Sequence, residues 1–161
     1  MNALSRLVRA SAAAFALVLA FTSLVAAETL VVLDAKAAGE TEVTRSDLEA
    51  MAQVEVSTTT EWTDGVTRFV GPKIRDVLER AGLDEANAVR AIAANDYAVE
   101  IPVADLLTYD AILAMRMNGE PLSLRNKGPL WIVFPRDEHE ALADPVFNTY
   151  WIWQLIRIEE L

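Results

Sequence analysis

The chain has 161 residues, no cysteine, a single histidine and a formal net charge of −10. Without cysteine it cannot form disulfides, iron–sulfur clusters, covalently attached haem or thiolate-bound metal sites, and one histidine excludes a multi-histidine metal site. The excess of acidic residues disfavours binding to nucleic acid and to anionic membranes, because both carry negative charge.

Residues 1–27 have the three zones of a secretory signal peptide. Two arginines precede an apolar run, and the small residues Ala26 and Ala27 form a cleavage site. The run is shorter than the roughly 20 residues that a membrane-spanning helix needs. We therefore expect this segment to be removed, residues 28–161 to form a single periplasmic or secreted domain, and the mature protein to have no stable membrane insertion.

The hydrophobic pattern predicts short strands interspersed with short helices, which is typical of an α+β domain with mixed β-sheets. In the first half, Thr44 followed by Asp47 predicts a helix start. The pair Gly71 and Pro72 predicts the start of a second helix, which we expect to end at Gly82. Strands are expected at 29–33, 53–60 and 66–70.

Turn residues organise the second half of the chain. Asn95-Asp96 predicts a hairpin turn, and Asn118-Gly119 is the strongest hairpin signal in the sequence. The run at 130–134 is continuously apolar, as in a strand buried on both faces. We also expect a short helix at 102–107 and strands at 88–94, 97–101, 111–117, 122–124 and 156–158.

Several short motifs follow one another between residues 54 and 158. They are FVGP at 69–72, AANDY at 93–97, IP at 101–102, NGEPL at 118–122, GPLW at 128–131 and FPRD at 134–137. No single motif is specific, but their order and spacing resemble the oxidoreductase molybdopterin-binding domain, and in particular its small exported members. The resemblance implies a sulfite-oxidase-like molybdopterin-binding fold.

The resemblance also implies a cofactor, molybdopterin. The family holds molybdenum between a pterin dithiolene and a cysteine thiolate. This cysteine normally lies in the loop after the strand that precedes the Gly-Pro motif. Here that region, residues 57–62, reads STTTEW, and a hydroxyl is a poor substitute for a soft thiolate. A histidine-glycine pair and an arginine of the family's enzymes correspond to Lys127-Gly128 and Trp131. We therefore expect no bound cofactor, no metal site and no catalytic residue.

Three basic residues flank the apolar run at 130–134 in this otherwise acidic chain: Arg125, Lys127 and Arg136. One interpretation is a pocket for a small anion, because arginine makes forked contacts with anionic groups. The other interpretation is a set of surface charges paired with nearby acidic residues, namely Glu120, Asp137 and Glu138.

The aromatic residues and the histidine also allow two interpretations each. Trp131, with either Trp151 or Trp153, is expected in the core, whereas Trp62 lies beside a turn and is the better candidate for stacking on a ligand. His139, flanked by two glutamates, is either an acid–base group or an exposed, inert side chain. Residues 58–60, three threonines, either continue a strand or line the former metal pocket.

The sequence is compatible with three functions. The preferred one is an exported accessory module without molybdenum redox catalysis, which binds a small anionic ligand or a periplasmic or membrane sensor protein. The second is a molybdopterin-dependent oxidoreductase with a non-cysteine metal ligand. The third is a structural interaction domain without a ligand.

Overall fold

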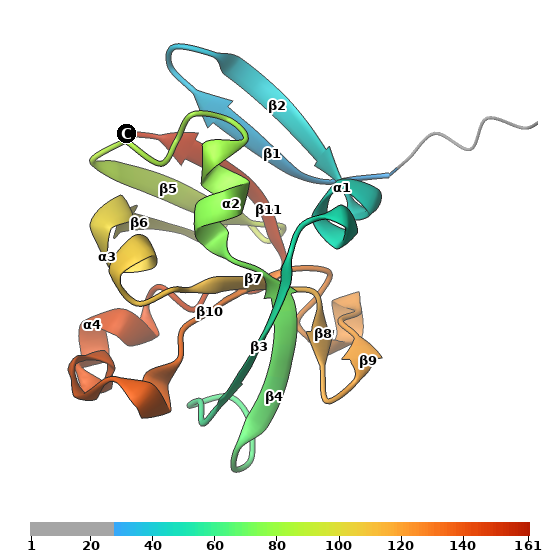
Figure 1. Ribbon diagram of the computed structural model, residues 1–161, viewed down its shortest axis with the longest axis vertical. Coiled ribbons are helices and arrows are strands. Elements are labelled where there is room, and N and C mark those ends of the chain that lie inside the picture. The colour runs from blue at the N-terminus through green and yellow to red at the C-terminus, as the bar shows by residue number, and fades with distance from the viewer. Residues whose placement is uncertain (1–27) are drawn as a thin grey trace, which may run out of the picture.

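A computed structural model describes residues 28–161, so the predicted signal peptide lies outside the described residues (Figure 1). The strands are β1 (Thr29–Ala35), β2 (Gly39–Thr44), β3 (Gln53–Thr58), β4 (Thr67–Pro72), β5 (Ala88–Ala93), β6 (Ala98–Pro102), β7 (Ile112–Ala114), β8 (Arg116–Met117), β9 (Glu120–Pro121), β10 (Trp131–Val133) and β11 (Leu155–Glu160). The α-helices are α1 (Arg45–Ala50), α2 (Ile74–Glu79), α3 (Val103–Thr108) and α4 (Pro145–Asn148). Three 3₁₀ helices follow the same chain order: η1 (Leu124–Asn126), η2 (Arg136–Glu138) and η3 (Glu140–Ala143).

The strands form three sheets, and together with the short helices they confirm the predicted α+β class. A five-stranded sheet has the order β2-β1-β11-β5-β6 and is mixed, because β1 and β11 are parallel while the other pairs are antiparallel. A four-stranded antiparallel sheet has the order β3-β4-β8-β9, and β7 pairs with β10. Figure 1 shows the long β3–β4 hairpin extending away from the five-stranded sheet, with β8 and β9 on one side and α4 on the other.

The core lies between these elements. Strands β7 and β10 are buried along their whole length, and β10 confirms the prediction of a strand covered on both faces. Helices α2 and α3 pack against each other, α2 beside β7 and α3 against β5 and β6. None of the helices within residues 28–161 is long and apolar enough to cross a membrane.

Local sequence signals are confirmed at several element boundaries. Thr44 caps α1 by accepting from the Asp47 N–H, while the Asp47 carboxylate accepts from the Thr44 backbone, which completes a capping box. Asn118 and Gly119 both have positive φ values, 52° and 88°, as a two-residue turn between twisted strands requires. The turn at Asn95-Asp96 joins β5 to β6 as predicted. Strand β2 and helix α4 were not predicted.

The predicted helix start at Gly71 and Pro72 is wrong. Both residues end β4 and pair with Val54 and Gln53 of β3, and α2 begins only after Lys73. Gly71 does not cap a helix; it allows the backbones of β4 and β7 to lie in close contact. A Cβ added there would lie 2.0 Å from the backbone oxygen of Leu113, so β4 can approach β7 this closely only because residue 71 has no side chain.

The predicted strands at 111–117 and 122–124 are also corrected. The first is divided at Met115 into β7 and β8, which belong to different sheets. The Met115 N–H donates to the Val70 oxygen, and its carbonyl accepts from Leu122, so this residue connects two segments outside either strand. The return strand β9 ends at Pro121, and Leu124 begins η1.

Replacing Gly71 with alanine tests the close approach of β4 and β7. We expect the free energy of unfolding to fall by more than about 2 kcal/mol, because the backbone of Leu113 cannot move aside as a flexible side chain would. Gly39→Ala is the control, since a Cβ there meets open space and only the positive φ is strained, at a cost of about 1 kcal/mol. Urea unfolding followed by circular dichroism measures both. Equal losses would contradict the steric explanation.

Candidate functional site

Four tryptophans meet at one end of the core. The Trp62 ring lies 6.3 Å from that of Trp131, 5.8 Å from that of Trp151 and 5.5 Å from that of Trp153, between centroids. Trp131 and Trp151 are buried, which confirms their predicted place in the core, and Trp62 and Trp153 are half-buried. Edge-on and tilted contacts of this kind are favourable because they bring ring edges onto ring faces. We call these four residues the tryptophan cluster.

The loop between β3 and β4 brings Trp62 to this cluster. The hairpin ends at the pair formed by Thr58 and Thr67, which leaves residues 59–66 as the connecting loop. Within it, the Thr60 hydroxyl accepts from the Trp62 N–H at 3.0 Å and lies 2.8 Å from the Thr63 hydroxyl. These short-range bonds shape the turn. Apart from Val66, the only large apolar side chain in the loop is the indole of Trp62, which packs inward against the other tryptophans.

Asp137 connects the start of this loop to the turn after β10. Its carboxylate accepts from the Thr59 N–H at 2.7 Å and from the Thr59 hydroxyl at 2.6 Å. Its own N–H donates to the Thr58 hydroxyl at 3.2 Å. One residue of η2 therefore holds the last residue of β3 and the first residue of the loop together.

The donor atoms here do not fit a molybdenum–thiolate centre. The chain has no cysteine. The hydroxyl of the fully buried Thr58 accepts from Asp137 and donates to the Thr59 carbonyl at 3.4 Å, and the Thr59 hydroxyl donates to the Asp137 carboxylate. Among residues 28–161 there is no group of three or more histidine, aspartate or glutamate side chains placed to hold a metal ion. The residues that occupy the cysteine's region therefore do not suit the cofactor that the resemblance implies.

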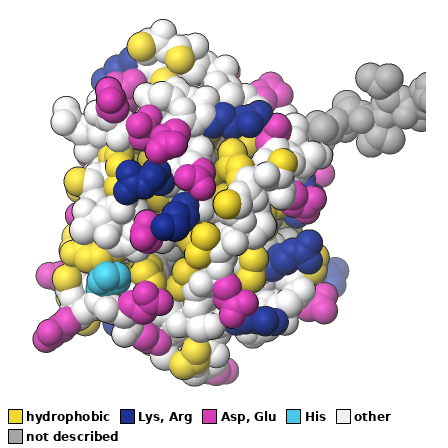
Figure 2. Space-filling model, viewed as in Figure 1, with side chains coloured by type: hydrophobic (Ala, Val, Ile, Leu, Met, Phe, Trp, Pro, Cys, Tyr) yellow, Lys and Arg dark blue, Asp and Glu magenta, His cyan; other side chains and the backbone are white. Residues whose placement is uncertain are grey.

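The structure separates the three basic residues that were candidates for an anion pocket. Arg136 forms an ion pair with Glu61 at 2.7 Å, so the predicted partners Glu120, Asp137 and Glu138 are wrong. Lys127 places its Nζ 5.6 Å from the Trp131 ring centroid and 5.9 Å from that of Trp153, a cation–π arrangement. Arg125 is exposed on η1. On the face shown in Figure 2, acidic and basic side chains are interspersed and form no basic patch.

Lys127 keeps its place because the neighbouring backbone is fixed. It has a positive φ of 61° at the end of η1, and its carbonyl accepts from the Gln154 N–H at 3.3 Å. The Gln154 side chain also donates to the Leu124 carbonyl at 2.9 Å. These two bonds join the η1 segment to Gln154, the residue that follows Trp153. Of the three basic residues predicted to bind an anion, Lys127 alone places its charged group against the tryptophan cluster.

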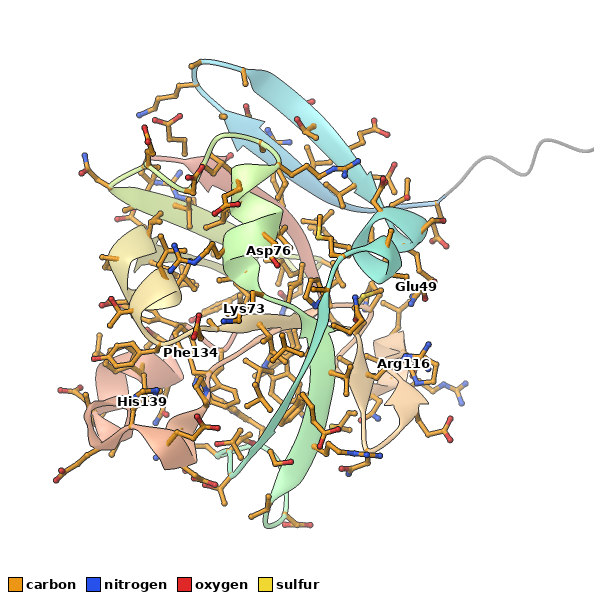
Figure 3. The ribbon with its side chains drawn as sticks, in the orientation of Figure 1. Glu49, Lys73, Asp76, Arg116, Phe134 and His139 are labelled. Carbon is orange, nitrogen blue, oxygen red and sulfur yellow. The ribbon has the colours of Figure 1, made fainter. Side chains whose placement is uncertain are left out.

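His139 lies elsewhere, at the end of the molecule that carries α4 and near Phe134 (Figure 3). It is half-buried, and its imidazole packs edge-on against the Tyr109 ring at 5.2 Å between centroids. Tyr109 in turn contacts Phe147 at 5.3 Å. The histidine thus belongs to an aromatic contact at this end, where Figure 2 shows it beside hydrophobic and acidic side chains.

A pocket of about 200 Å³ opens beside the tryptophan cluster. Its walls come from the β3–β4 loop, the turn between β5 and β6, and the segment from the end of α4 to β11: Trp62, Ala93, Asn95, Tyr97, Asn148, Thr149, Trp151, Ile152 and Trp153. Of the predicted site residues only Trp62 lines it. Asn95 was predicted only as part of a turn, and no local pattern marks Tyr97, Asn148 or Thr149 as residues of a site.

Replacing Asp137 with alanine tests the connection that holds the loop. We expect a loss of about 1–2 kcal/mol in unfolding free energy, since the Thr59 N–H and hydroxyl lose a charged acceptor, and a shifted indole N–H signal for Trp62 in ¹⁵N NMR spectra. Glu138→Ala is the matched control, because this exposed neighbour makes no side-chain hydrogen bond within residues 28–161. Similar behaviour of the two variants would show that Asp137 does not hold the loop.

Comparison with known proteins agrees with this fold. No curated protein matches the chain. Among solved structures, the chain is similar to the sulfane dehydrogenase SoxCD from Paracoccus pantotrophus, with a TM-score of 0.62 and 17% sequence identity, over 81% of this chain and 37% of that chain. This chain thus spans little more than a third of the length of the SoxCD chain. At 17% identity the similarity is evidence for a shared fold alone, and that fold is sulfite-oxidase-like. Residues 24–138 match the oxidoreductase molybdopterin binding domain. The chain therefore belongs to the oxidoreductase molybdopterin-binding domain family.

Proposed function

We propose that this chain is an exported accessory module of its family that does not carry out molybdenum redox catalysis and instead binds a small ligand. The observation that carries the proposal is that the threonine hydroxyls of residues 57–62, where the family has its cysteine ligand, form hydrogen bonds within the protein. Those of Thr58 and Thr59 are both engaged with the backbone or with Asp137. A metal bound here would find only hard hydroxyl oxygens, that of Thr58 fully buried, in place of a soft thiolate.

The tryptophan cluster supports binding in place of redox chemistry. The resemblance implies that Trp131 corresponds to an arginine that helps to hold the anionic pterin in the family's enzymes, and the indole of Trp62 packs against Trp131. Lys127 supplies a positive charge next to these rings. We therefore place the predicted anion contact at Lys127, because Arg136 is neutralised by Glu61. A periplasmic or membrane sensor is the alternative partner, and it would need to contact Lys127 and the half-buried Trp62 and Trp153.

Export rests on the sequence of residues 1–27. Its basic start, short apolar run and small residues before Glu28 are those of a cleaved signal peptide. The remainder has a charge of −12, because two basic residues but no acidic residue precede Glu28. Such a charge keeps a protein soluble and disfavours adhesion to anionic membrane surfaces.

Isolation from the native host tests both parts of the proposal. We expect the protein in the periplasmic or secreted fraction with Glu28 as its first residue by mass spectrometry. Molybdenum and extractable pterin should be far below one equivalent, because no soft protein ligand is present. A cysteine-containing family member isolated in parallel is the positive control. Stoichiometric molybdenum with pterin would instead establish the alternative, an oxidoreductase with a non-cysteine ligand, and an intact N-terminus in the cytoplasm would contradict export.

The anion contact is tested with inorganic phosphate and sulfate in thermal unfolding. At about 100 times its dissociation constant, a bound ion should stabilise the protein by roughly 2.7 kcal/mol, beyond the effect of chloride at equal ionic strength. Lys127→Gln should abolish this gain, whereas Lys36→Gln, which makes the same change of charge in the exposed β1–β2 turn, should retain it. An equal gain in the parent and in Lys127→Gln would show that the anion does not bind at Lys127.

A further inference from the structure

Large hydrophobic side chains are exposed on the segments that form the pocket beside the tryptophan cluster. Among residues 28–161 five such side chains are exposed, and Leu124 and Val66 are the most exposed, at 68% and 67%. Tyr97, Val146 and Ile156 are the other three. Single exposed apolar residues are ordinary, whereas a group of them around a concave site marks an interaction surface. The position of these residues relative to the pocket therefore matters.

Two of the five belong to one wall of the pocket or are bonded to it. Tyr97 lines the pocket, and its hydroxyl lies 3.5 Å from the Thr149 carbonyl. Thr149 is also a wall residue, and its hydroxyl donates to the Val146 carbonyl at 2.7 Å. The exposed side chain of Val146 thus lies on the helix that ends in this wall.

Two more lie on the segments that carry the half-buried tryptophans. Val66 is in the β3–β4 loop together with Trp62. The Leu124 carbonyl accepts from the side chain of Gln154, the residue that follows Trp153. We call six side chains the apolar surface: Trp62, Val66, Tyr97, Leu124, Val146 and Trp153.

The pocket in the apolar surface has the size of one side chain. Pockets for drug-sized molecules usually measure about 300–1,000 Å³, and this one measures about 200 Å³. Its lining contains three tryptophans and no charged side chain. Partner proteins commonly anchor themselves by inserting one large apolar side chain into a pocket of this kind. The pocket therefore suits the anchor of a protein contact.

Unpaired positive charge lies next to the apolar surface. Lys127 places its Nζ 5.9 Å from the Trp153 ring centroid, and Arg125 is exposed on the same η1 segment. Within residues 28–161, no acidic side chain forms an ion pair with either of them. Complementary charges fix the orientation of a partner on a surface. A partner that fits here carries an acidic side chain beside its apolar anchor.

Trp153 sets the spacing between these two contacts. It lines the pocket, and it also lies under the charged group of Lys127. In an extended peptide, residues i and i+2 point to the same side and are about 7 Å apart, because each residue advances the chain by about 3.3 Å. An apolar and an acidic side chain two positions apart can therefore reach the pocket and the lysine together.

A second copy of this chain and a lipid surface both fit less well. A two-fold contact sets the same patch of both subunits together, so Lys127 would meet apolar residues and another lysine in place of a carboxylate. A bilayer places no single side chain in a pocket, and the excess of acidic residues disfavours anionic lipid. A segment of a different protein meets both the apolar and the charge requirement.

We propose that the apolar surface docks an extended segment of a partner protein, whose large apolar side chain fills the pocket and whose acidic side chain, two residues away, pairs with Lys127. The inference deepens the proposed function and rests on it, because the anion at Lys127 is then a carboxylate that a protein carries. The exposed side chains of Val66, Leu124 and Val146 extend the contact beyond the pocket.

Three capped tripeptides separate the two contacts: acetyl-Phe-Ala-Glu-amide, acetyl-Phe-Ala-Gln-amide and acetyl-Ala-Ala-Glu-amide. Titration of the first into the ¹⁵N-labelled full chain should shift the indole N–H signals of Trp62, Trp151 and Trp153. It should bind about threefold more tightly than the glutamine peptide, as expected of an exposed ion pair. It should bind about tenfold more tightly than the peptide without phenylalanine, because the pocket buries the phenyl ring.

Variants assign each preference to its residue. Lys127→Gln should make the glutamate and glutamine peptides equal and leave the preference for phenylalanine unchanged. Tyr97→Ala should reduce the preference for phenylalanine to about threefold, because one wall of the pocket is lost. Lys36→Gln and Ile156→Ala are the matched controls, since both residues are exposed and neither lines the pocket. Circular dichroism and amide dispersion establish that each variant is folded.

Several results would overturn the inference. These are the absence of shifts in the three tryptophan signals at millimolar peptide, equal affinity for the peptides with and without phenylalanine, or a preference for glutamate that persists in Lys127→Gln. Sedimentation of the native protein as a dimer that Tyr97→Ala dissociates would assign the surface to a second copy. Binding to phosphatidylglycerol vesicles that the same variant abolishes would assign it to a membrane. Stoichiometric molybdenum in the native protein would refute the proposed function without altering the peptide ratios, so the two failures are distinguishable.

Discussion

The carboxylate of Asp137 is the contact on which the site depends. Its two bonds to Thr59 fix the beginning of the β3–β4 loop beside η2, and the ion pair between Arg136 and Glu61 fixes the next part of the same loop. With both anchors in place, Trp62 lies against three other tryptophans. Two adjacent residues of one short turn thus position a side chain that is more than 70 residues away in sequence.

These anchors also explain why the cysteine's region has a different chemistry here. A hydroxyl is a hard donor, unlike a thiolate, and the hydroxyls of Thr58 and Thr59 bond instead within the protein: that of Thr58 accepts from the Asp137 N–H, and that of Thr59 donates to the Asp137 carboxylate. The loop is consequently closed by hydrogen bonds and aromatic packing, interactions that need no metal. The sheets on either side of the loop are themselves held by backbone hydrogen bonds and buried apolar side chains, so neither the sheets nor the loop depends on a metal ligand for its position.

Local chemistry made part of this fold predictable from sequence. The capping box of Thr44 and Asp47 and the turn at Asn118 and Gly119 depend on residues a few positions apart, so their patterns were sufficient. Gly71 was assigned to a helix start because Gly-Pro often stands there. Its actual role is set by Leu113, a contact between strands of different sheets that no local pattern records.

The candidate site was less predictable for the same reason. One of the two interpretations of Arg136 paired it with acidic residues nearby in sequence, but its partner is Glu61, which only the assembled fold brings close. Asn95 and Asn148 resemble ordinary turn and helix-end residues, and they become the wall of one pocket because β5, α4 and the β3–β4 loop converge. The site combines an uncharged pocket with a lysine held over the adjoining tryptophans. In a chain with so large an excess of acidic residues, this lysine is set against aromatic rings by a cation–π arrangement, whereas the lining of the adjoining pocket has no charged side chain.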